Sequence, residues 1–146
     1  MILPITLDNL NKNIELYVSV FNEPPWEDNW TFEKAERRFL DLLHTPRFVG
    51  FSYYHNEELV ALAAGNCEEW SDGELFYLKE MCVRPNMQGQ EIGTRLLSYL
   101  DAHLQERGVM YSYLLTLQEG QAASFYAKNS YKKDLNTVFM LHKLKK

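Results

Sequence analysis

The sequence contains few residues of the kinds that staple small folds together or break chains into flexible segments. Among its 146 residues are only two cysteines, Cys67 and Cys82, with seven glycines and five prolines. Two isolated thiols make neither a disulfide framework nor a thiolate zinc site, so a reducing, cytoplasmic location is the default expectation. The composition shows no low-complexity or disordered segment either.

Long apolar runs and basic clusters are also missing. No stretch approaches about 18 consecutive apolar residues, and the start Met1–Ile5 lacks a basic segment, so neither a membrane span nor a secretion signal is predicted. The formal net charge is -5, and lysines gather only in the tail 143–146, which argues against a nucleic-acid surface. A small molecule is the expected partner, and a homodimer is compatible with the sequence. The four histidines form no ligand-spaced pair, so no metal site is predicted: His44, His55, His103 and His142.

What is present is the composition of one folded domain, expected to span residues 1–146, with 46% hydrophobic and 24% charged residues. Hydrophobic periodicity predicts elements of alternating type. These are a strand Met1–Leu7, a helix from Leu10 to Phe21, a helix between Thr31 and His44, strands Phe48–Tyr54, Leu59–Ala64 and Leu75–Val83, a helix from Ile92 to Gly108, a strand Val109–Leu117, a helix Gln121–Lys128 and a strand Thr137–Leu144. This order predicts an α/β fold with a mixed sheet and helices on its faces.

The predicted strand Leu75–Val83 has two largely apolar faces and should therefore be central. Simple alternation places four residues on each face. One face carries Phe76, Leu78, Glu80 and Cys82, and the other carries Tyr77, Lys79, Met81 and Val83.

The segment from Val83 to Thr94 is a polar, glycine-bearing turn between this strand and an amphipathic helix. Such a turn directs free backbone N–H groups and the positive end of a helix at one point, where a pyrophosphate can bind without lysines. An ordinary strand-to-helix loop would use its glycines for backbone geometry alone. The loop by itself does not decide between these readings.

The pattern Val83-x-Pro85-x-x-Gln88-Gly89-x-x-Ile92-Gly93-x-x-Leu96-Leu97 resembles the acetyl-CoA motif of the GCN5-related N-acetyltransferase (GNAT) family. Downstream, Leu114-Leu115-Thr116 is similar to the family's fifth strand, and the run from Ala122 to Tyr131 is similar to the helix with its catalytic tyrosine. The resemblance covers about Leu75 to Leu141. More faintly, Phe21–Trp26 is similar to bacterial members that act on small molecules, such as aminoglycoside acetyltransferases.

This resemblance implies the GNAT acyl-CoA N-acyltransferase fold, a mostly antiparallel central sheet with splayed fourth and fifth strands and helices on both faces. It also implies direct transfer of an acetyl group from acetyl-CoA to a primary amine. The acetyl group would lie near Met81, Cys82 and Val83, where a backbone N–H of Cys82 or Val83 could stabilise the oxyanion. The residues expected to hold the rest of the cofactor are Gln88, Gly89, Gln90, Glu91, Ile92, Gly93 and Thr94.

Two side chains are the candidate catalytic groups. Tyr126 corresponds to the family tyrosine that protonates, or hydrogen-bonds to, the departing CoA thiolate; the alternative is a packed aromatic on a short helix. Glu80 interrupts an apolar strand face beside the proposed acetyl site, so it is the candidate base that takes the proton of the amine. It could instead pair with a nearby Lys or Arg, or only bind substrate. Cys82 is more often a small buried hydrophobe than a nucleophile.

An acidic and aromatic pocket for a cationic amine is a further candidate. Its members would be Trp26, Trp30, Trp70, Glu68, Glu69 and Asp72. Solvated loop charges with structural tryptophans are the alternative, and the more common situation.

The sequence departs from the family pattern in three places: Glu91 replaces the second loop glycine, Glu119 an asparagine, and Ser130-Tyr131 a Gly-Phe pair. If the backbone at Glu91 needs positive φ, a non-glycine residue costs about 1–2 kcal/mol, and its charge near pyrophosphate adds about 1 kcal/mol. Together these correspond to about ten- to a hundredfold in affinity. A right-handed backbone at Glu91 would remove the first cost.

Two other functions remain open. A binding module of the same fold would hold acyl-CoA, or only a partner, without turnover. A protein acetyltransferase would modify lysines or N-termini of proteins and leave small amines untouched. The N-terminal half, which would shape the acceptor pocket, has no decisive motif.

Overall fold

The computed structural model describes residues 1–146, which form two compact units, Met1–Leu115 and Thr116–Lys146. The second unit contains the helix α4 (Gln121–Lys128). The first unit contains all the strands and the remaining helices: β1 (Ile2–Pro4), α1 (Leu10–Phe21), α2 (Phe32–Leu43), β2 (Phe48–His55), β3 (Glu58–Trp70), β4 (Gly73–Val83), α3 (Ile92–Arg107) and β5 (Tyr111–Tyr113), with short 3-10 turns at Leu7–Asn9 and Pro85–Met87.

The five strands of the first unit form one sheet in the order β1-β2-β3-β4-β5. All neighbours are antiparallel except β4 and β5, which are parallel. The predicted mixed sheet is therefore confirmed. The turn between β2 and β3 uses Asn56 and Glu57, both at positive φ (51° and 66°), which suits the right-handed twist of a hairpin.

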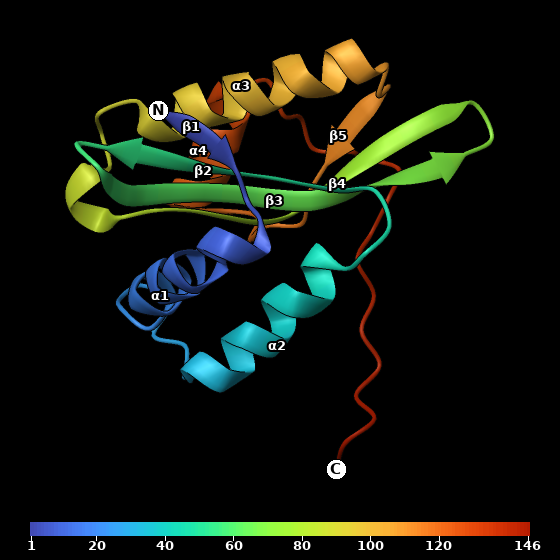
Figure 1. Ribbon diagram of the computed structural model, residues 1–146. Coiled ribbons are helices and arrows are strands. Elements are labelled where there is room, and N and C mark those ends of the chain that lie inside the picture. The colour runs from blue at the N-terminus through green and yellow to red at the C-terminus, as the bar shows by residue number, and fades with distance from the viewer. The chain divides into compact units, whose positions relative to one another are not determined.

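Helices cover both faces of this sheet, α1 and α2 on one and α3 on the other (Figure 1). Helix α3 packs through the predicted apolar stripe, all of it buried: Ile92, Leu96, Leu97, Leu100 and Leu104. The helix stops at Gly108, which takes φ 89° as a left-handed cap. Helix α2 begins as predicted after Thr31, whose hydroxyl accepts the N–H of Lys34 at 3.2 Å.

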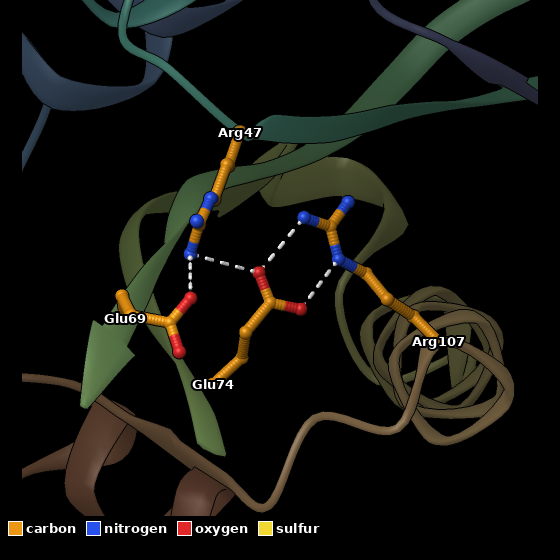
Figure 2. A network of polar contacts seen from close by, with 4 residues as sticks. All are labelled: Arg47, Glu69, Glu74 and Arg107. Atoms are coloured by element: carbon orange, nitrogen blue, oxygen red, sulfur yellow. Dashed lines mark hydrogen bonds and ion pairs between the residues drawn. The ribbon is translucent and has the colours of Figure 1, made fainter. Parts of the chain in front are cut away.

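A cluster of four charged side chains ties together the ends of β3, β4 and α3 (Figure 2). Arg107 donates to both carboxylate oxygens of Glu74, at 2.9 and 3.0 Å. Arg47 reaches Glu74 at 3.2 Å and Glu69 at 3.0 Å. This bidentate arrangement is stronger than a single surface ion pair, and it fixes the start of β4 against the end of α3.

A β-bulge changes which face several β4 side chains occupy. Ala64 pairs with Glu80 and Gly65 with Leu78, so Lys79 is an extra residue without a partner on β3. Gly65 is required here because a Cβ at this position would lie 1.9 Å from the carbonyl oxygen of Tyr77. The predicted simple alternation is therefore wrong: Tyr77 and Lys79 face the side of α2, together with Glu80.

Two strand predictions near the C-terminus are also wrong in extent or existence. Strand β5 covers only Tyr111–Tyr113, because pairing with β4 ends there, and the residues resembling a fifth strand, Leu114-Leu115-Thr116, lie beyond it. The segment Thr137–Leu144 forms no strand. Its apolar side chains are exposed, Val138 by 76% and Leu141 by 85%, so no partner strand satisfies its β-propensity.

Candidate active site

Strand β4 has an open edge next to its C-terminal half. It pairs with β5 at only three positions, the last being Tyr77 with Tyr113. Beyond that point the main chain from Leu78 to Val83 continues without a strand on this side, and the two strands part. An extended ligand can add to such an edge through main-chain hydrogen bonds. The predicted acetyl site, Met81 to Val83, lies on this edge.

The loop after β4 is shaped by two residues in left-handed conformation. Gly89 has φ 81° and Glu91 has φ 62°. Glu91 therefore has the positive φ at which a residue with a Cβ is strained, and the right-handed alternative is wrong. Within the loop, the Gln88 amide donates to the Val83 carbonyl at 3.1 Å, and the Gln90 amide to the Asn86 carbonyl at 3.4 Å. Both side-chain amides are engaged within the loop. A ligand at this loop would therefore contact its main-chain groups.

The N-terminus of α3, which follows this loop, has no side-chain cap. Its N-cap residue is Glu91, whose side chain accepts no hydrogen bond from the first turn. Helix α2, in contrast, is capped by Thr31. The first N–H groups of a helix find no partner within the helix, and they carry the positive end of its dipole. The predicted residues Ile92, Gly93 and Thr94 form this first turn, and their main chain suits an anion such as a phosphate.

Glu80 is a buried carboxylate with two partners from the helices. Only 6% of it is exposed, and it forms an ion pair with the Arg38 guanidinium through Nε. The Tyr17 hydroxyl of α1 is also within its hydrogen-bond reach. Burial raises the pKa of Glu80, and the charge and hydrogen bond of Arg38 and the hydrogen bond of Tyr17 oppose this rise. The pairing with an arginine that the sequence left open as an alternative is thus present.

A surface cleft of about 460 Å³ opens beside this ion pair, between α2 and β4. Its lining combines both signs of charge with one aromatic ring: Arg38, Asp41, Leu42, Thr45, Tyr77 and Lys79. The Lys79 ammonium lies 5.4 Å from the centre of the Tyr77 ring. The bulge places Lys79 and Tyr77 in this cleft, so a small polar molecule here would lie next to Arg38 and the open edge of β4.

Cys82 is buried at 6% exposure, within the core beneath α1 and α2. Burial and the nearby Glu80 carboxylate raise the pKa of its thiol. A neutral, inaccessible thiol is a poor nucleophile. The geometry therefore favours the structural alternative for this side chain.

The tryptophans of the predicted aromatic pocket lie apart. Trp30 packs edge-on against Tyr17, with ring centres 5.2 Å apart, and Trp26 packs against Phe21. Trp70 ends β3 at the β3–β4 turn, at the opposite end of this unit from the connection between α1 and α2 (Figure 1). The first two tryptophans are thus wedged against α1, and Trp70 is 56% exposed.

Glu68 meets a different pair of aromatic residues. It accepts a hydrogen bond of 2.6 Å from the Tyr113 hydroxyl. The Tyr113 ring in turn stacks on the Tyr77 ring, with centres 4.6 Å apart and an interplanar angle of 17°. Burial and this hydrogen bond raise the pKa of Tyr113. The Glu68 carboxylate therefore holds Tyr113, whose ring packs on Tyr77 in the lining of the α2–β4 cleft.

Tyr126 lies in the second unit, on α4. Its ring contacts Phe125 and Tyr131, with ring centres 5.2 and 5.6 Å apart. Its main-chain carbonyl accepts the N–H groups of Asn129 and Tyr131 at 3.0 Å. Both aromatic contacts are with residues close to Tyr126 in the sequence, within the second unit.

Sequence reasoning missed Arg38, Tyr17, Asp41 and Lys79 as members of a site. Arg38 and Glu80 are 42 residues apart, and the helical period of α2 marks only its apolar positions. The bulge that turns Lys79 toward α2 depends on a contact between two strands. No local pattern in the sequence carries either signal. Among the described side chains, no group of three or more His, Cys, Asp or Glu could hold a metal ion.

Comparison with known proteins identifies the domain type. A family model for the Acetyltransferase (GNAT) domain matches residues 47–133. A sequence search finds no match among curated proteins. None of the helices is long and apolar enough to cross a membrane.

Solved structures share the fold along the whole chain. An aminoglycoside acetyltransferase from an uncultured soil metagenomic sample, in complex with sisomicin, has a TM-score of 0.77 at 19% identity, covering 99% of this chain and 96% of that one. An aminoglycoside 6'-N-acetyltransferase from Acinetobacter haemolyticus has a TM-score of 0.77 at 13% identity, covering 99% of both chains. A transcriptional regulator from Bacillus halodurans has a TM-score of 0.78 at 18% identity, covering 97% and 99%. At these identities the likeness establishes the fold alone.

Proposed function

Because the chain belongs to the GNAT acetyltransferase family, we propose that it transfers the acetyl group of acetyl-CoA directly to a primary amine of a small molecule. The observation that carries this proposal is the uncapped N-terminus of α3 beside the open edge of β4. One feature supplies main-chain donors for phosphates, and the other supplies a main-chain edge for an extended arm. Both features suit the two ends of an acyl-CoA.

The residues proposed to hold acetyl-CoA follow from this arrangement. The turn from Gln88 to Thr94 would hold the pyrophosphate through its main chain, because the Gln88 and Gln90 side chains are used within the loop. The main chain from Met81 to Val83 would hold the thioester, with an N–H of Cys82 or Val83 directed at its oxygen. No metal ion takes part in this proposal.

In the proposed reaction, the amine nitrogen attacks the thioester carbonyl carbon, and the carbon–sulfur bond breaks. The proton lost by the amine passes to Glu80, directly or through water, and the thiolate of CoA receives a proton from Tyr126. The role of Tyr126 rests on the family resemblance of its helix. We also propose that residues 1–146 act as one domain, which the family match across residues 47–133 supports because it spans both units.

We propose the cleft between α2 and β4 as the acceptor site, and an aminoglycoside- or polyamine-like molecule as the acceptor. Asp41 offers the cleft a carboxylate for an ammonium group, and Tyr77 offers the face of an aromatic ring. The likeness to an aminoglycoside acetyltransferase in complex with sisomicin supports this class. We also propose a cytoplasmic location, because both cysteines are free thiols and a reducing compartment keeps thiols free.

The alternative is a binding module of the same fold that holds acyl-CoA or a protein partner without turnover. The likeness to a transcriptional regulator keeps this alternative open. Release of the CoA thiol from acetyl-CoA, measured with a panel of aminoglycosides, polyamines and a lysine peptide, separates the two. If the chain is an enzyme, release of the CoA thiol should depend on the amine and should fall at least tenfold in Tyr126→Phe. Tight CoA binding with no release for any amine would favour the module.

A further inference from the structure

The buried carboxylate and the surface cleft meet at one residue, Arg38. Glu80 is 6% exposed, whereas the Arg38 side chain is 47% exposed and lines the cleft. The contact between them uses Nε of the guanidinium. A guanidinium bound through Nε keeps its other N–H groups for further acceptors. Arg38 therefore touches the carboxylate on one side and the cleft on the other.

The other groups that face Glu80 cannot replace Arg38. From α1 comes the neutral Tyr17 hydroxyl, and β3 contributes the apolar Ala64, which pairs with Glu80. From β4 itself come the exposed Lys79, whose ammonium lies over the Tyr77 ring, and the buried Cys82 thiol. Arg38 is thus the cation in direct contact with the carboxylate. Without such a partner, a buried carboxyl group binds a proton and becomes neutral.

We propose that Arg38 is a positioning residue of the acetyl-transfer site, which keeps the Glu80 carboxylate ionised and oriented while its exposed part lines the acceptor cleft. This inference rests on the proposed function, in which Glu80 takes the proton of the amine. A base must be ionised before it can accept a proton. Loss of Arg38 should therefore move the acidic limb of the pH–rate profile to higher pH, and a merely structural contact would leave that limb in place.

The first test does not need turnover. The full chain is labelled with 13C at the glutamate carboxyl groups, the Glu80 signal is assigned with Glu80→Gln, and its titration is followed by NMR. In Arg38→Gln the pKa of Glu80 should rise by about 1 to 3 units, the usual effect of an adjacent opposite charge. Arg37→Gln, the neighbouring exposed arginine of α2, is the control and should leave the titration unchanged. An unchanged pKa in folded Arg38→Gln would overturn the proposal.

Arg38→Lys covers the case in which Arg38→Gln does not fold. The lysine retains the charge but loses the Nε contact, so the pKa of Glu80 should still rise, by less than in the glutamine variant. A folded lysine variant with the wild-type titration would contradict the proposal.

The second test links the titration to catalysis. The acidic limb of kcat/KM for the best acceptor should shift together with the Glu80 titration in each Arg38 variant. If the titration moves and the acidic limb does not, Arg38 does not act on the reaction, although acetyl transfer itself stands. If no amine is acetylated, the proposed function fails, and the NMR titration alone still decides whether Arg38 keeps Glu80 ionised.

Discussion

Replacement of Glu91 by glycine should stabilise the protein and tighten CoA binding by two separable effects. Glu91 has φ 62° and ψ 15°, a left-handed conformation, at the N-cap of α3. A residue with a Cβ has a higher energy there, because the Cβ approaches its own carbonyl oxygen. Its carboxylate also stands at the helix end where the phosphates are proposed to bind.

The structure determines how the two effects divide. The left-handed conformation of Glu91 is part of the fold at the start of α3, so its energy of about 1–2 kcal/mol acts on folding. The greater freedom of glycine in the unfolded chain removes about 0.4–1 kcal/mol of the gain, which leaves about 1 kcal/mol of net stabilisation. Removal of the charge contributes about 1 kcal/mol to binding, or about fivefold in affinity. The affinity gain is therefore smaller than the ten- to hundredfold expected from the sequence.

Glu91→Ala separates these effects, since it removes the charge and keeps the Cβ. The free energy of unfolding, measured by urea titration, should be about 1 kcal/mol higher for Glu91→Gly than for Glu91→Ala. Calorimetry should show CoA binding about fivefold tighter than wild type for both variants, and the gain should fade at high salt. Equal stabilities of the glycine and alanine variants would refute the strain, and unchanged or weaker CoA binding would refute the repulsion.

Three further predictions concern the scaffold and its charges. Gly65→Ala should lower the free energy of unfolding by about 3 kcal/mol in urea titration, because its Cβ would lie 1.9 Å from the Tyr77 carbonyl oxygen; a loss below about 1 kcal/mol would mean that the bulge can relax. The pKa of Glu74 is lowered by its hydrogen bond with Arg107, so this contact stabilises the fold above the ordinary pKa of 4.5 and is lost as pH falls through the lowered value. Glu74→Gln should flatten this acid-side loss in thermal melts, whereas an identical pH dependence would show that the pair in Figure 2 adds nothing. The pH dependence from Glu80 runs the opposite way, because its pKa is raised. Its contribution to stability is complete below the ordinary pKa and is lost as pH rises through the raised one. In Glu80→Gln the stability should therefore no longer decline as pH rises, and the fold should be retained. A variant much less stable than wild type at neutral pH would contradict this prediction.

Those parts of the fold that depend on local pattern were predictable from the sequence. The leucine stripe and Gly108 define α3, and Thr31 defines the start of α2, because helix periodicity and capping act over a few residues. The turn between β4 and α3 was predictable for the same reason. Only its backbone conformation at Glu91 had to come from the structure.

Features that depend on contacts between distant segments were not predictable. The bulge at Lys79 arises where Gly65 meets the Tyr77 carbonyl across two strands. The ion pair between Arg38 and Glu80 joins α2 to β4. The segment Thr137–Leu144 shows the converse, because its β-prone residues form a strand only when a partner strand is present.

Acetyl transfer to an amine is the activity proposed for this chain. The most direct measurement incubates the purified full chain with acetyl-CoA labelled in the acetyl group and each amine of the panel, and follows labelled N-acetyl product by mass spectrometry alongside free CoA thiol. One labelled acetyl group should appear on the amine for each thiol released, at a rate that falls in both Glu80→Gln and Tyr126→Phe. Saturated CoA binding without labelled product from any small amine or peptide would contradict it.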